Sequence, residues 1–174
     1  MSQQESITPQ QQAKRPRSAI AGPYGHPLHP IMVTIPIGTW VASFIFDLAN
    51  IFSDDHESFS RGAIWLIGIG IVGALLAAIL GLIDLSTLTR GTVANRTALT
   101  HMSINLLVVV LFVVNFIVRL GSDYDALNIP GFLISIVALL MLTASGWLGG
   151  KLAYRYGVRV ADEQTQAEGF RATP

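Results

Sequence analysis

Four long apolar stretches dominate this chain of 174 residues and constrain its fold more than any other feature. They cover residues 30–52, 63–83, 101–120 and 129–148, and each is long enough, at about 1.5 Å per helical residue, to cross roughly 30 Å of hydrocarbon. The stretches are apolar on every face and carry no charge near their centres, which argues against a soluble bundle with buried core helices. Only 13% of the chain is charged, whereas 51% is hydrophobic. The sequence therefore predicts an all-α protein, a four-helix transmembrane bundle.

The distribution of basic residues predicts how the bundle is oriented. An even number of spans places both termini on the same side, together with the loop between the second and third spans. Nine of the eleven basic residues fall on that side: Lys14, Arg15, Arg17, Arg90, Arg96, Lys151, Arg155, Arg159 and Arg171. The other side has only Arg61 and Arg119. The positive-inside rule therefore predicts a multi-pass membrane protein with both termini in the cytoplasm.

Outside the spans the chain is short. Residues 1–21 are rich in Gln and Ser and lack the apolar core of a signal peptide, so we expect a disordered cytoplasmic tail, followed by the transmembrane domain at 22–156 and a short cytoplasmic tail at 157–174. The chain has no cysteine, which excludes disulfides, thiolate metal sites and cysteine-ligated iron–sulfur clusters. Because the loops are short as well, any site must be built from helix ends.

The first span begins with an unusual polar segment, Gly-His-Pro-Leu-His-Pro at residues 25–30. Pro30 suits the first turn of a helix because its missing amide hydrogen would be unpaired there in any case, which places His29 at the helix start. Pro36 lies inside the span and leaves the Met32 carbonyl without its helical partner. We therefore expect a kink in the cytoplasmic half of this helix.

The second span carries a stripe of small residues that ends in a carboxylate. At about 100° per residue, the spacing of three and four puts these residues on one face: Gly70, Gly73, Ala77, Gly81 and Asp84. Small residues let helix backbones approach closely, so Asp84 should face the bundle interior and need a partner. The available partners on that side are His26, His29, His101, Arg90, Arg96 and Lys151. Such a pair is compatible with a cofactor site and equally with a purely structural role.

The other helices bring polar groups to the same end. The third span begins with His101 and places Asn105 one turn later on the same face. The fourth span ends at Lys151 within a belt of glycine, aromatic and basic residues that is typical of membrane anchoring. We therefore expect one polar cluster at the cytoplasmic end, made of His26, His29, Asp84, His101, Asn105 and Lys151.

Several of these motifs together resemble a bacterial membrane-protein family catalogued as domain of unknown function 2231. They are G-H-P-L-H-P followed by I-M-V-T-I-P-I-G, the G-L-I-D end of the second span, the histidine and asparagine that open the third span, and G-G-K-L-A-Y-R-Y-G at the end of the fourth. The resemblance covers roughly residues 22–160. It implies a four-helix domain in a bacterial cytoplasmic (inner) membrane, without an established activity. Some similar proteins carry an added Rieske-type domain, which associates the family with electron transfer.

The first functional hypothesis is a redox module near the cytoplasmic face. His29 and His101 would be axial ligands of a b-type haem or would flank a quinone, because imidazoles on facing helices commonly hold haem in bundles. Asp84 and Lys151 would meet haem propionates or tune a quinone, and Asn105 would complete the site. A redox partner protein or membrane complex, and a homo-oligomer, are compatible with this hypothesis.

Two alternatives remain open from the sequence. One is a divalent metal site formed by His26, His29, His101 and Asp84, since H-x-x-H lets two imidazoles approach one ion. The other is an accessory or structural subunit without a cofactor. A transporter is less favoured because no charge marks a route at mid-membrane, and the chain has no independent catalytic motif and no basic patch for nucleic acid.

Overall fold

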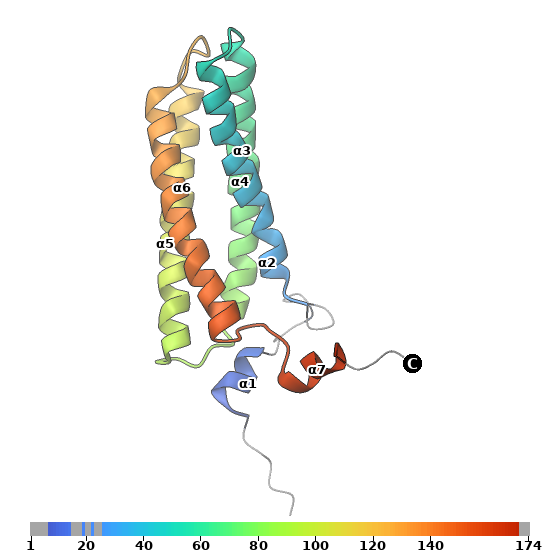
Figure 1. Ribbon diagram of the computed structural model, residues 1–174. Helices are drawn as coiled ribbons and strands as arrows, with labels where there is room; N and C mark the ends of the chain where they lie inside the picture. The colour runs from blue at the N-terminus through green and yellow to red at the C-terminus, as the bar shows by residue number, and fades with distance from the viewer. Residues whose placement is uncertain (1–6, 15–18, 20–21, 23–25, 171–174) are drawn as a thin grey trace, which may run out of the picture.

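The computed structural model describes residues 7–14, 19, 22 and 26–170. Its long helices form an elongated four-helix bundle (Figure 1), and among the described residues every regular element is helical. Four helical stretches are long and apolar enough to cross a membrane: Leu28–Ile51, His56–Leu85, Val93–Leu120 and Ile129–Arg155. The predicted fold class is confirmed.

The first span is divided into α2 (Leu28–Met32) and α3 (Thr34–Ile51), with Val33 between them. The Val33 amide donates to the His29 carbonyl at 3.1 Å and the Ile37 amide donates to the Val33 carbonyl at 3.2 Å, so helical bonding resumes on both sides of the break. The break lies next to Met32, whose carbonyl is the one that Pro36 leaves without a donor. The predicted kink is therefore confirmed.

The other spans are α4 (His56–Leu85), α5 (Val93–Leu120) and α6 (Ile129–Gly150), the last continued by a π-helical turn, η3 (Lys151–Arg155). Side-chain caps set where they begin: Asp55 accepts from the Ser58 amide, Thr92 from the Asn95 amide and Asn128 from the Gly131 amide. Because capped polar turns precede the apolar segments, α4 and α5 start seven and eight residues earlier than hydropathy predicts.

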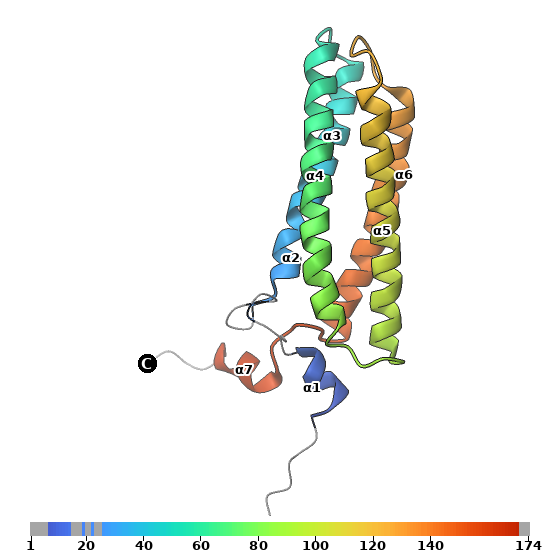
Figure 2. The ribbon, with the colours of Figure 1, turned by 180° about the vertical axis from the view of Figure 1, so that it is seen from behind.

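The bundle consists of two helical hairpins, α3–α4 and α5–α6, that repeat one another. The buried residues Pro36, Trp40, Ser43 and Asp47 of α3 correspond, at a constant separation of 72 residues, to the buried Val108, Phe112, Asn115 and Arg119 of α5. The α3 and α5 helices run in the same direction, so equivalent residues lie at equal depth (Figures 1 and 2). The hairpins are therefore related by a pseudo-twofold axis along the bundle, as in parallel membrane repeats.

Equivalent residues meet across this axis at three levels. Asp47 and Arg119 form an ion pair at one end, which we call the arginine end. Trp40 and Phe112 stack in the middle with ring centroids 4.0 Å apart. His29 and His101 face each other at the opposite end, which we call the histidine end. The axis therefore runs from a buried ion pair through an aromatic core to a pair of imidazoles.

Two short helices, α1 (Pro9–Lys14) and α7 (Glu163–Glu168), lie beyond the histidine end (Figures 1 and 2). The Arg159 amide donates to the Ala13 carbonyl at 3.1 Å, and Lys14 pairs with Glu163 at 3.0 Å. Residues 7–14 thus differ from the disordered tail predicted for 1–21, because the C-terminal segment supplies partners for them. The rest of that tail, apart from residue 19, lies outside the described residues.

Candidate functional site

His29 is held against α4 by two features of the α4 backbone. Its Nδ1 lies 2.8 Å from the Ala77 carbonyl oxygen. One turn further along, Gly81 leaves space for the imidazole, because a Cβ there would lie 3.1 Å from Cε1 of the ring. The small-residue stripe of α4 therefore serves to seat this ring, which the sequence predicted only as close helix packing.

His101 is held against α6 in the same way. Its Nδ1 lies 2.8 Å from the Ser145 carbonyl oxygen, and a Cβ on Gly149 would lie 3.2 Å from its Cε1. Ser145 also places its hydroxyl 2.9 Å from Nδ1. Each hairpin therefore seats one histidine by a carbonyl and a glycine that are four residues apart.

These contacts fix the tautomer of both rings. A backbone carbonyl oxygen only accepts, so Nδ1 must carry the proton and donate it in each histidine. A neutral imidazole protonated at Nδ1 has its lone pair on Nε2. Hydrogen bonding of Nδ1–H to a backbone carbonyl is the arrangement that orients histidines which bind a metal through Nε2.

The two rings are close enough to share a ligand. Their centroids are 6.5 Å apart and their planes are nearly perpendicular, at 87°. Two iron–nitrogen bonds of about 2 Å, plus about 1 Å from each nitrogen to its ring centre, would place the centroids of two axial imidazoles about 6 Å apart. The observed centroid separation is within about 0.5 Å of that value.

Asn105 makes the two histidines unequal. Its Nδ2 lies 3.1 Å from Nε2 of His101 and donates to the His101 carbonyl at 3.0 Å. The equivalent residue in the first hairpin is Val33, which has no polar side chain. Within the described part of the chain no hydrogen bond to Nε2 of His29 is found. Among the described residues the two rings therefore differ: Nε2 of His101 is capped by an amide that has to move before a ligand binds, and Nε2 of His29 has no such cap.

Asp84 does not join the histidines as its main partner. Its Oδ1 lies 3.0 Å from Nε of Arg159, and both side chains are largely buried. This corrects the prediction, which considered only His26, His29, His101, Arg90, Arg96 and Lys151 as partners. The reason is that residues 157–159 turn back under the bundle, with left-handed backbone at Gly157 (φ 66°) and Arg159 (φ 59°).

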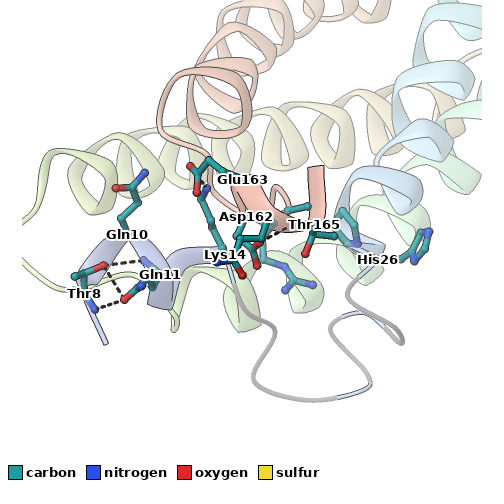
Figure 3. A pocket seen from close by; sticks show the side chains of 12 residues that line it. Thr8, Gln10, Gln11, Lys14, His26, Asp162, Glu163 and Thr165 are labelled. Atoms are coloured by element: carbon teal, nitrogen blue, oxygen red, sulfur yellow. Dashed lines mark hydrogen bonds and ion pairs between the residues drawn. The ribbon is translucent and has the colours of Figure 1, made fainter. Parts of the chain in front are cut away.

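His26 and Lys151 lie apart from the histidine pair. His26 is exposed and lines a polar pocket of about 770 Å³ between α1 and α7, together with Lys14, Asp162 and Glu163 (Figure 3). Lys151 places Nζ 5.6 Å from the centre of the Tyr156 ring. Over the residues that the structure describes, no group of three or more His, Asp or Glu side chains is arranged to hold a metal.

Sequence reasoning missed the polar network at the arginine end. Arg119 makes two bonds of 2.7 Å to the Asp47 carboxylate, and its Nε donates to Asn115 at 2.7 Å. Asn115 in turn donates to the Ser135 hydroxyl at 2.8 Å. The network joins α3, α5 and α6. The available signal was the repeat itself, since the separation of 72 residues that pairs the histidines also pairs Asp47 with Arg119.

Comparison with known proteins agrees with this architecture. The family described as predicted membrane protein (DUF2231) matches residues 25–162, which include all four spans and both histidines. No curated protein and no solved structure matches the chain. The match covers well over half of the sequence, so the chain belongs to the DUF2231 family of predicted membrane proteins.

Proposed function

We propose that this protein is a redox-linked membrane module in which His29 and His101 bind the iron of one b-type haem. The observation that carries the proposal is the pairing of two Nδ1-protonated imidazoles across the pseudo-twofold axis, with centroids 6.5 Å apart. Two imidazoles on facing helices are a common means of holding haem in a bundle. Bound haem would supply one-electron transfer, and a redox partner protein is expected at the same membrane.

The tautomers favour iron over a quinone. A quinone carbonyl oxygen needs a hydrogen-bond donor, but both Nδ1–H groups already donate to backbone carbonyls. The remaining Nε2 atoms are acceptors, which suits a metal ion and not a carbonyl oxygen. A haem therefore fits the donor set better than a quinone does.

The surrounding residues have separate roles in this proposal. The carbonyls of Ala77 and Ser145 fix the ring orientations. Gly81 and Gly149 have no side chain and so leave space for the rings. Asn105 would have to leave Nε2 of His101 for that atom to hold iron. Lys151 contributes positive charge at the same end of the bundle, where haem propionates need it.

Titration of haem into the purified apoprotein tests the proposal. We expect saturation at one haem per chain, with the sharp α-band of a low-spin, six-coordinate haem after reduction. Absence of such a band in haem-replete protein would contradict the proposal. A protein that binds a divalent metal but no haem would favour the alternative of a metal site at the two imidazoles. A protein that binds neither would favour the alternative of an accessory subunit.

We further propose that the histidine end faces the cytoplasm of a bacterial inner membrane, because most basic residues lie at that end. The natural absence of cysteine makes single-cysteine labelling a clean test. A membrane-impermeant maleimide applied to intact cells should label Asp54→Cys, in the loop at the arginine end, and label Gln164→Cys in α7 only after permeabilisation. The reverse pattern would contradict this orientation.

A further inference from the structure

A long groove runs along the outer face of the bundle between α4 and α5. It has a volume of about 620 Å³. Apolar side chains form most of its surface: Ile64, Trp65, Ile69, Leu76, Phe116 and Leu120. Several of these face outward, with Trp65 74% and Ile69 47% exposed. The groove therefore lies on a surface that meets the hydrocarbon of the membrane.

Two glycines of α4, Gly68 and Gly73, line the groove. The Phe116 ring of α5 lies over Gly68, where a Cβ would come within 3.2 Å of Cε2. Ile35 and Pro36 of α3 pack onto Gly73, where a Cβ would come within 2.6 Å of Ile35 Cγ2. The two glycines therefore let side chains of α3 and α5 lie close to the α4 backbone, and the groove runs along α4 past both levels.

One end of the groove carries an arginine, which is paired with Glu57, and an aromatic ring. Arg61 and Tyr124 line it there, with the guanidinium carbon 4.6 Å from the centre of the Tyr124 ring. Glu57 accepts from Nε of Arg61 at 2.7 Å, and the guanidinium carries two further nitrogens with hydrogens to donate. Tyrosine, tryptophan and arginine near a helix end mark the depth of the lipid head groups.

The rest of the groove matches a hydrocarbon chain. The groove follows α4 from Arg61 to Leu76, and the fifteen steps between these residues span about 22 Å at 1.5 Å per step. This is more than half of a hydrocarbon layer of roughly 30 Å, so the groove reaches beyond the middle of the membrane. A molecule that fills it needs a long apolar chain and, at the Arg61 end, an anionic head.

We propose that this groove is a binding site for one anionic phospholipid, with an acyl chain along α4 and the phosphate at Arg61. The two parts of the site contribute differently. Burial of the acyl chain against Gly68 and Phe116 supplies affinity for any lipid of suitable length. The two guanidinium nitrogens of Arg61 that do not contact Glu57 supply the preference for an anionic head. Glu57 offsets part of the charge, so the preference is at most the roughly fivefold of one basic residue near the surface.

Native mass spectrometry of the full chain, equilibrated with equal amounts of phosphatidylglycerol and phosphatidylcholine with identical acyl chains, tests the proposal. Wild type should retain one lipid per chain and prefer phosphatidylglycerol, by up to about fivefold. Arg61→Gln should retain a lipid but lose the preference, whereas Arg90→Gln, at the histidine end, should keep it. Equal retention of the two lipids by wild type would overturn the proposal.

A second variant tests the acyl-chain part of the site. Ile69→Trp places a large side chain in the groove from an exposed position, so it should fold normally and lose the retained lipid. Leu140→Trp on α6 is the matched control, because Leu140 is 68% exposed and does not line the groove. Unchanged retention of lipid by the Ile69→Trp variant would show that lipid does not occupy the groove.

Discussion

Replacing Arg119 with leucine is expected to destabilise the protein by about 3–5 kcal/mol, because it leaves the Asp47 carboxylate buried without a partner. The side chains of Arg119 and Asp47 are only 3% and 2% exposed, and two bonds of 2.7 Å join them. The substitution also removes the donor to Asn115, whose amide links Arg119 to Ser135 on α6. Thermal unfolding followed by circular dichroism in mild detergent measures the effect.

Two controls separate the unpaired charge from lost packing. The double variant Asp47→Leu/Arg119→Leu removes both charges and should be clearly more stable than Arg119→Leu alone. Arg61→Gln breaks an exposed pair with Glu57 and should change stability by at most about 1 kcal/mol. An Arg119→Leu protein that unfolds like wild type would show that the ion pair does not hold the two hairpins together.

Replacing either histidine of the pair should abolish six-coordinate haem binding. His29→Ala and His101→Ala each leave one imidazole, so the low-spin bands should disappear and affinity for haem should fall by more than roughly 100-fold, since loss of outer-shell partners alone costs up to that much. His26→Ala is the matched control, because His26 is exposed and lines the separate polar pocket. It should titrate like wild type.

Added imidazole distinguishes a ligand from a structural residue. A free imidazole should occupy the space left by the missing ring and restore the low-spin spectrum of either variant. Circular dichroism should show the same helix content in all three single variants. Loss of the low-spin bands in His26→Ala as well, or in neither pair variant, would contradict the assignment of His29 and His101 as the ligands.

The spans and the kink were predictable because their causes are local. The thickness of the hydrocarbon layer sets the length of a spanning apolar stretch. Proline has no amide hydrogen, so Pro36 interrupts the hydrogen bonding of its helix whatever the surrounding packing. The first residues of the helices were less predictable. Asp55 and Thr92 cap α4 and α5 ahead of the apolar segments, so both helices begin with polar turns that a hydropathy pattern assigns to loops.

The histidine positions were predictable in depth but not in contact. His29 and His101 were expected at the same depth in the membrane because the first and third spans both start at the cytoplasmic end. The structure places the centroids of their rings 6.5 Å apart. The partner of Asp84 was missed because Arg159 lies in a segment whose return depends on left-handed backbone at Gly157 and Arg159. The Asp47–Arg119 pair was missed because the two residues are 72 positions apart, and only the repeat of the two hairpins shows that their positions are equivalent.

The electron paramagnetic resonance spectrum of the ferric, haem-loaded protein tests the central claim most directly. The planes of the two rings are 87° apart, and perpendicular axial imidazoles leave the iron orbitals nearly degenerate. We therefore predict a highly anisotropic low-spin signal with one prominent low-field feature. A high-spin signal, the three-line rhombic spectrum of parallel imidazoles, or a protein that takes up no haem would contradict an iron held between His29 and His101 as the structure orients them.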